Sequence, residues 1–141
     1  MQSRLNGTTE PLRVLVADDD DEMRTLVIQM LQTDGCVAAE ARDGAELLEL
    51  LEQAFDEPSL RPDVVITDVK MPRLSGLGVL DALRRARWSL PVVVITAVSD
   101  ESIETVARRL GATGVLHKPF DPDDLMTAVR NAKLVRTLRH P

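Results

Sequence analysis

The stretch "RVLVADDDDEM", residues 13–23, passes from short apolar and small side chains at residues 14–17 straight into four consecutive aspartates at residues 18–21. Four like charges in a row repel one another, and such a run is usually a solvated surface segment. The other interpretation is that these acids have a function because of the apolar run they follow. The elements that the rest of the sequence predicts decide between the two.

Short apolar runs rich in β-branched residues recur along the chain. They predict five strands, at residues 12–17, 36–40, 63–68, 91–97 and 114–118. Residues 64–66 and 92–95 are apolar without polar alternation, which is typical of parallel strands covered on both faces. The sequence therefore predicts a parallel sheet buried between layers of helices.

Helical patterns lie between these strands. Apolar residues recur with the 3.6-residue period of a helix at Met23, Leu26, Val27 and Met30, at Ile103, Val106, Ala107 and Leu110, and at Leu125, Val129 and Ala132. Asp121 and Pro122 suit the start of the last helix. Gly35, Gly111 and Gly114 lie where helices are expected to end. Strands that alternate with helices predict right-handed βαβ crossovers and a doubly wound α/β sandwich.

The composition of the 141 residues fits one globular domain. A net charge of -6 and only 2% aromatic residues argue against a nucleic-acid partner, which would need positive charge and stacking platforms. The single cysteine, Cys36, cannot form an internal disulfide, and the sequence shows no signal peptide or membrane-spanning run. We expect a cytoplasmic domain over residues 12–134, without membrane partners, between a flexible lead-in at 1–11 and a tail at 135–141.

The position of the aspartates favours a functional role. Ligands of doubly wound sheets bind at the carboxyl ends of the strands, where the strand order reverses. Asp18 and Asp19 follow the first strand and Asp68 ends the third, so the three carboxylates converge if the strand order is 2-1-3-4-5. Three carboxylates this close need a compensating charge, and Mg²⁺ prefers oxygen ligands of this kind.

The ends of the other strands supply complementary groups. Thr96 offers a hydroxyl beside the small Ala97, and Lys118 offers an ammonium. Each alone has an ordinary structural explanation, as a strand-end hydroxyl or a surface lysine. Together with a metal held by carboxylates they predict a phosphoryl site.

Four segments of the chain resemble the receiver domain of two-component response regulators, the CheY-like family. They are "VLVADDD" at 14–20, "DVVITDVKMPRLSG" at 63–76, "VVVITA" at 92–97 and "HKPF" at 117–120. The resemblance covers residues 12–134 and implies a flavodoxin-like three-layer sandwich whose five-stranded parallel sheet has the order 2-1-3-4-5.

The resemblance also implies roles for the residues at the strand ends. Asp68 is then the phosphoacceptor, and Thr96 and Lys118 contact the phosphoryl oxygens. The implied ligands of Mg²⁺ are the carboxylates of Asp18, Asp19 and Asp68 and the backbone carbonyl of Lys70. The family further implies a cis peptide bond between Lys118 and Pro119.

Three features depart from the family pattern. Val115 stands where the family often has a Tyr or Phe that reorients on phosphorylation. The segment "EQAFDEPSLRP" at 52–62 is longer than the usual connection, and the Lys70 side chain puts a charge at the mouth of the site. We interpret Asp20 as an acid on the loop face, and residues 21 and 22 as favourable charge at a helix start.

The sequence thus predicts a signalling receiver that takes a phosphoryl group from a histidine kinase or a phosphotransfer protein onto Asp68. Phosphorylation is expected to switch a surface for a downstream output protein, formed by the strand at 114–118 and the helices on either side of it. The chain would then be no enzyme beyond assisting its own phosphorylation and dephosphorylation. One alternative is a haloacid-dehalogenase-like phosphatase, whose nucleophile and second acid Asp18 and Asp20 could mimic. The other is a receiver-like scaffold that is not phosphorylated.

Overall fold

Five parallel strands form one sheet at the centre of the computed structural model, which describes residues 10–97 and 101–139, the last four by backbone alone. Along the sheet the order is β2-β1-β3-β4-β5, as expected. The strands are β1 (Arg13–Ala17), β2 (Val37–Ala41), β3 (Val64–Asp68), β4 (Val92–Ala97) and β5 (Gly114–Lys118). Their bounds lie within one residue of the predicted strands, because the apolar runs are short and turn residues bound them.

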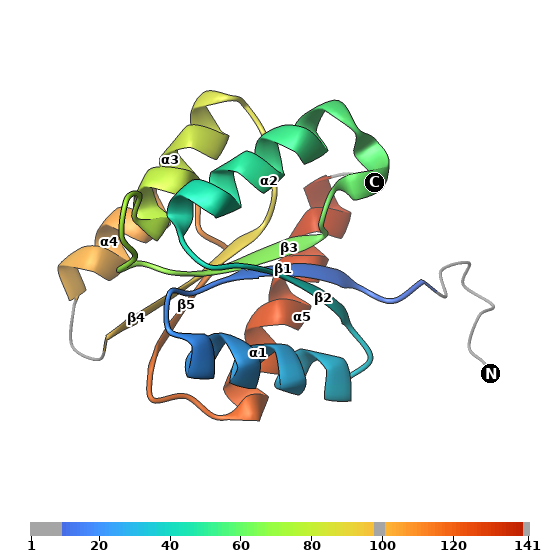
Figure 1. Cartoon of the computed structure of the whole chain (residues 1–141), viewed down its shortest axis with the longest axis vertical. Coiled ribbons are helices and arrows are strands. Elements are labelled where there is room, and N and C mark those ends of the chain that lie inside the picture. Colours follow the sequence, from blue (N-terminus) through green and yellow to red (C-terminus); the bar gives the residue numbers. More distant parts are fainter. Residues whose placement is uncertain (1–9, 98–100, 140–141) are drawn as a thin grey trace.

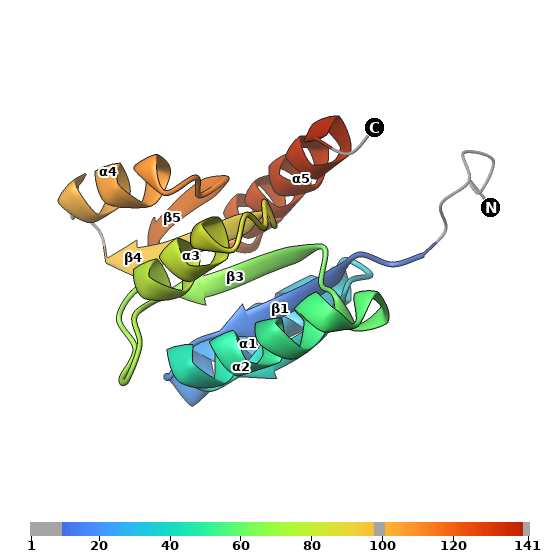
Figure 2. The same cartoon turned by 90° about the horizontal axis from the view of Figure 1, so that it is seen from above.

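Helices cover both faces of this sheet (Figures 1 and 2). They are α1 (Asp21–Thr33), α2 (Gly44–Asp56), α3 (Gly76–Arg85), α4 (Glu101–Arg109) and α5 (Pro122–Arg139). One core cluster packs α1 and α5 against the sheet, and a second packs α2, α3 and α4 against its other face. Successive residues of β3 belong to alternate clusters, which explains why that strand is apolar without interruption. The three-layer sandwich is therefore confirmed.

The buried face of α1 agrees with the predicted one at three of four residues. Val27 is buried, and Met23 and Met30 are partly buried against the same core cluster. Leu26 is instead 44% exposed, and the buried stripe also includes Arg24 and Leu31. In α5 the predicted residues Leu125, Val129 and Ala132 are all buried.

The sequence predicted three helix ends, at Gly35, Gly111 and Gly114, and one helix start, at Asp121, and the structure agrees with all of these except Gly114. Gly35 and Gly111 follow α1 and α4 with φ values of 87° and 89°, a conformation that favours glycine. Gly114 is instead the first residue of β5, so its prediction as a helix end was wrong. Asp121 caps α5: its Oδ1 accepts the backbone N–H of Asp124 at 2.9 Å, and Asp124 Oδ2 accepts that of Asp121 at 3.1 Å.

The chain ends bear on the expected domain limits. Helix α5 runs to Arg139, so the expected boundary at residue 134 falls inside a continuous helix. Most of the expected lead-in, residues 1–9, lies outside the described residues. Among the described helices none has the length and apolar character needed to cross a membrane.

The long segment at 52–62 is ordered by Arg61. Helix α2 takes its first five residues, and a 3-10 turn, η2 (Pro58–Leu60), follows. The Arg61 guanidinium donates to the backbone carbonyls of Ala54, at 3.0 Å, and Phe55, at the C-terminal end of α2. It also lies 5.6 Å and 5.5 Å from the ring centroids of Phe55 and Trp88, which contact each other edge to face. Arg61 therefore joins α2 to the α3–β4 connection.

We expect Arg61→Met to lower the free energy of unfolding by about 1–3 kcal/mol, because hydrogen bonds to charged groups and a cation–π contact are lost while the apolar stem remains. Urea unfolding followed by circular dichroism measures this loss. Arg85→Ala is the matched control, since Arg85 forms an exposed i,i+4 ion pair with Asp81 and should change stability by less than about 0.5 kcal/mol. Equal effects of the two substitutions would contradict the proposed role of Arg61.

Candidate functional site

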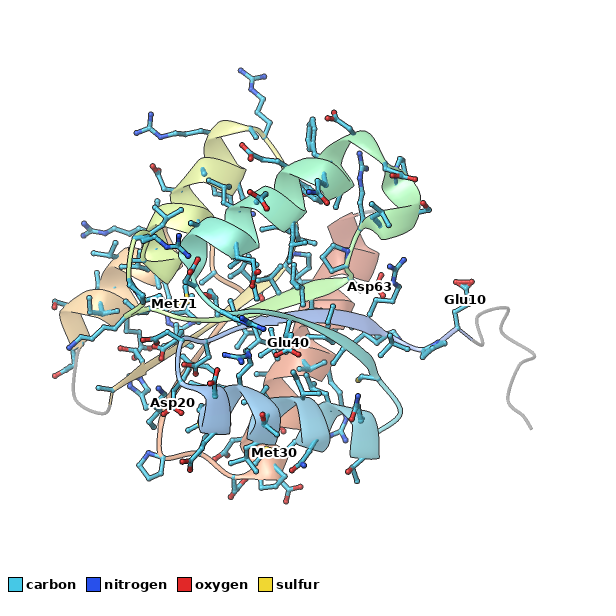
Figure 3. All side chains as sticks on the ribbon, in the orientation of Figure 1. Glu10, Asp20, Met30, Glu40, Asp63 and Met71 are labelled. Atoms are coloured by element: carbon cyan, nitrogen blue, oxygen red, sulfur yellow. The ribbon has the colours of Figure 1, made fainter. Side chains whose placement is uncertain are left out.

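The carboxylates at the ends of β1 and β3 meet at one edge of the sheet. The two strands are neighbours, with Ala17 opposite Thr67 in the register, so the residues that follow these two lie side by side. One oxygen each of Asp18, Asp19 and Asp68 lies within 4.8 Å of the other two. Figure 3 shows Asp20 and Met71, from the loops around this cluster, at one end of the sheet and Asp63, which precedes β3, at the opposite end. The structure thus brings together the three acids that the sequence singled out.

The cluster is partly neutralised by groups on neighbouring segments. Lys118 Nζ lies 2.9 Å from Oδ2 of Asp68, and the backbone N–H of Lys70 donates to Oδ1 of the same carboxylate at 3.2 Å. Asp18 Oδ1 accepts the backbone N–H of Asp20 at 2.9 Å. Asp18 Oδ2 is buried and has no hydrogen-bond partner in the part of the chain that the structure describes.

Burial shapes the protonation of these groups. Asp18 is 1% exposed and Asp68 is 6% exposed, whereas Asp19 is exposed. Burial raises the pKa of the Asp18 carboxyl to about 6. The hydrogen bond from the Asp20 backbone lowers this pKa, and the negative charge of Asp68 raises it further. Burial would lower the pKa of Lys118, but its hydrogen bond and attraction to Asp68 outweigh this, so that pKa is raised above the ordinary value. Lys118 is therefore a fixed positive charge beside Asp68.

The site has the properties of a divalent-cation site. Its donors are hard carboxylate oxygens, one of which, Asp18 Oδ2, is buried without a partner. Such an atom is costly unless a cation or a proton satisfies it. Oxygen ligands in this arrangement suit Mg²⁺. The acid cluster therefore fits the metal that the sequence predicts.

The remaining predicted residues lie on the adjoining strands. In the register of β3 and β4, Asp68 pairs with Ile95, so the buried Thr96 lies one residue beyond Asp68 on the next strand. Lys118 ends β5 and pairs with Ala97. The peptide bond between Lys118 and Pro119 is cis, as expected. Lys70 is exposed on the loop after β3.

Asp20 has a structural role that the sequence did not indicate. Asp20 is the N-cap of α1, and its Oδ1 accepts the backbone N–H groups of Glu22 at 3.0 Å and Met23 at 3.3 Å. The side chain is exposed, in keeping with an acid on the loop face, and it also stabilises the start of α1. Asp21 and Glu22 occupy the first turn of α1, as the sequence predicted.

A buried arginine beside the site was missed from the sequence. Arg24 is 6% exposed and donates to the Asp18 backbone carbonyl at 2.8 Å, to Glu40 at 2.7 Å and to Asp21 at 2.6 Å. It fixes the backbone from which the Asp18 carboxylate projects. The available signal was its place in the stripe with Val27 and Leu31, spaced three and seven residues on.

Fold and site together define a doubly wound α/β domain with a carboxylate cluster and a lysine at the switch point of its sheet. The family model for the response regulator receiver domain matches residues 14–130. The chain belongs to the response regulator receiver domain family.

Curated relatives and solved structures agree with this assignment. The chain is 39% identical to transcriptional regulatory protein PdtaR of Mycobacterium tuberculosis over 123 residues, covering 86% of this chain and 57% of that protein. It is 36% identical to protein-glutamate methylesterase/protein-glutamine glutaminase 4 of Myxococcus xanthus over 145 residues, covering 90% of this chain and 38% of that protein. The chain therefore spans only part of the length of these relatives.

Two solved structures show how closely the fold is shared. A response regulator receiver domain protein from Clostridium thermocellum has a TM-score of 0.79 and 30% identity, covering 90% of this chain and 98% of that one. The chemotaxis response regulator CheY4 of Vibrio cholerae has a TM-score of 0.76 and 30% identity, covering 87% and 99%.

We expect Asp18→Asn to stabilise the metal-free protein at pH 8. The pKa of about 6, against an ordinary 3.8, means that the folded protein holds this proton more tightly than the unfolded chain. Ionisation of Asp18 therefore destabilises the fold increasingly as the pH rises from about 4 to about 6. The shift corresponds to about 3 kcal/mol at most, and asparagine keeps the oxygen that accepts from Asp20.

Urea unfolding in excess EDTA measures this gain, which should shrink as the pH falls below about 6. Asp19→Asn, at the exposed member of the cluster, is the control and should stabilise less. An Asp18→Asn variant that is no more stable than the wild type at pH 8 would show that the buried charge carries no such cost.

Proposed function

We propose that this domain accepts a phosphoryl group on Asp68 from a histidine kinase or a histidine phosphotransfer protein. The observation that carries the proposal is the convergence of Asp18, Asp19 and Asp68, with an unpartnered buried oxygen on Asp18 and the Lys118 ammonium on Asp68. In this proposal Mg²⁺ is held by the three carboxylates and by the backbone carbonyl of Lys70. The membership of the receiver domain family supports this assignment.

The proposed reaction is an in-line displacement at phosphorus. An oxygen of Asp68 forms the new bond to phosphorus while the bond from phosphorus to the donor nitrogen breaks, and the histidine leaves with that electron pair. The bound cation would neutralise negative charge on the phosphoryl oxygens and carboxylates. Lys118, now 2.9 Å from Asp68 Oδ2, would follow the charge onto a phosphoryl oxygen, and Thr96 would donate to another.

Neither alternative gains support. A haloacid-dehalogenase-like phosphatase would use Asp18 as nucleophile and Asp20 as its second acid, but Asp20 Oδ1 is occupied by two backbone N–H groups of α1. An unphosphorylated scaffold would not need the buried carboxylate of Asp18, whose ionisation the fold disfavours. We propose that the domain acts as a switch and catalyses no reaction besides its own phosphorylation and dephosphorylation.

We expect acetyl phosphate to phosphorylate the wild-type protein at Asp68, and only with Mg²⁺ present, because the carboxylates repel a dianionic group without a cation. Intact-mass and peptide mass spectrometry measure the product. Asp68→Asn should abolish labelling, whereas Asp20→Asn should be labelled like the wild type because asparagine also caps helices. Undiminished labelling of Asp68→Asn, or labelling at Asp18, would contradict the assignment.

We further propose that the surface of α4, β5 and α5 transmits the signal to a downstream output protein. Glu104 on α4 contacts His117 on β5 at 2.7 Å, which ties the helix to the strand that ends in Lys118. Arg108, one turn further along α4, donates to the other oxygen of Glu104 at 3.0 Å. Movement of Lys118 toward a phosphoryl group would therefore act on the position of α4. Nucleic-acid binding is not part of this proposal, in keeping with the net charge of -6.

The absence of an aromatic ring at Val115 should limit the rearrangement of this surface. Val115 is half-buried and packs against the cluster beneath α4. We expect structures with and without beryllofluoride, a phosphoryl mimic, to differ mainly in α4, with Val115 nearly unmoved. A displacement centred on Val115 that leaves α4 in place would contradict this expectation.

A further inference from the structure

The loop between β3 and α3 carries Lys70, whose backbone carbonyl is a proposed metal ligand. The tip of this loop, at Arg73, is held by contacts of its own. Gly76 N–H donates to the Val69 carbonyl at 2.9 Å, which closes the base of the loop. At the tip, Arg73 has a φ of 70°, in the left-handed region that side chains other than glycine rarely adopt. Within the loop, the Leu74 N–H donates to the Pro72 carbonyl at 2.8 Å and closes a turn around Arg73. A second interaction, from outside the loop, adds to this one.

That interaction comes from the start of α2. The Arg73 guanidinium forms an ion pair with Oδ2 of Asp43, a buried residue. The other oxygen of Asp43 accepts the backbone N–H of Glu46 at 2.8 Å, as the N-cap of α2. One carboxylate therefore anchors a helix and the loop at the same time.

The neighbouring residues show how closely the two segments approach. A Cβ atom on Gly44 would lie 1.8 Å from the backbone carbonyl oxygen of Leu74. Glycine at this position therefore lets the loop lie directly on the first turn of α2. The ion pair spans the same contact, one residue away on each side.

We propose that the Arg73–Asp43 ion pair is a latch that holds the β3–α3 loop in its cation-binding form, which makes Arg73 a positioning residue for the metal site. The inference rests on the proposed function, because Lys70 is a ligand only in that proposal. The latch restricts residues 70–73, so the carbonyl of Lys70 is presented before a cation arrives. Without it, the loop would populate conformations in which Arg73 leaves the left-handed region.

The charges of the pair allow a sharp test. Arg73→Gly removes a positive charge from the loop that follows Asp68, and by Coulomb's law alone the loss of a positive charge does not weaken Mg²⁺ binding. Glycine also adopts a positive φ without strain, so the variant can still form the loop conformation seen in the wild type. Loss of the latch instead predicts a weaker Mg²⁺ affinity. Asp43→Asn removes the ion pair while retaining an N-cap oxygen for α2.

Isothermal titration of the metal-free protein with Mg²⁺ at pH 8 measures the effect. We expect the Kd to rise roughly 3- to 10-fold in Arg73→Gly and in Asp43→Asn, with the double variant no worse than either, because both remove the same interaction. Arg73→Lys should restore part of the affinity. Arg85→Ala is the control for charge, since it removes an exposed arginine of α3, and its Kd should not rise.

Hydrogen exchange in the absence of Mg²⁺ gives a readout that does not depend on the metal. The amides of residues 69–71 and 73–75 should exchange faster in both single variants, while those of β3 stay protected. An unchanged or lower Kd in Arg73→Gly, or unchanged exchange in this loop, would overturn the latch while leaving the metal site intact. Failure of the wild-type protein to bind Mg²⁺ would overturn the proposed site and the latch together.

Discussion

The rest of the site depends on one constraint, the burial of the Asp18 carboxylate with too few hydrogen-bond partners. Asp18 Oδ2 is buried and unpartnered among the described residues, and the adjacent Asp68 raises the cost of its charge. The sheet imposes this arrangement, because β1 and β3 are hydrogen-bonded neighbours whose carboxyl ends coincide. Lys118, from the far edge strand β5, offsets part of the repulsion through Asp68. The buried oxygen of Asp18 is therefore the atom that a cation at the proposed metal site would satisfy.

The supporting structure keeps these groups close despite their repulsion. Arg24 holds the Asp18 backbone from the α1 side, and the Arg73–Asp43 ion pair ties the loop after Asp68 to α2. Helices on opposite faces of the sheet thus each contribute a charged anchor. The buried charge of Arg24 is stabilised by three hydrogen-bond acceptors. The buried charge of Asp43 is stabilised by Arg73 and by the backbone N–H that it accepts as the N-cap of α2. Rigid strands and these anchors give the site a defined geometry before any ligand binds.

The sequence predicts most of this arrangement, and the limits of the prediction have physical causes. Uninterrupted apolar runs identify strands that helices cover on both faces, and residues just beyond such strands lie at the ligand-binding edge, so Asp18, Asp68 and Thr96 could be placed. The role of Asp20 could not, because aspartate caps helices and lines loops equally well until the helix start is known. Arg24 was hidden by its charge, since periodicity counts only apolar residues. The contact of Arg73 with Asp43 joins segments 30 residues apart, and no local pattern encodes it.

The packing of Arg61 on Phe55 and Trp88 also decides what the protein's own fluorescence can report. Trp88 is the sole tryptophan of the chain and there is no tyrosine. It lies in the connection that enters β4 at its amino end, whereas the carboxylate cluster lies at the carboxyl ends of the strands. Its emission is therefore sensitive to the Arg61 charge and to the contact between α2 and the α3–β4 connection. Occupancy of the acidic site would reach this indole only through the body of the sheet, so a spectral change on adding a ligand would signal a rearrangement across the whole domain.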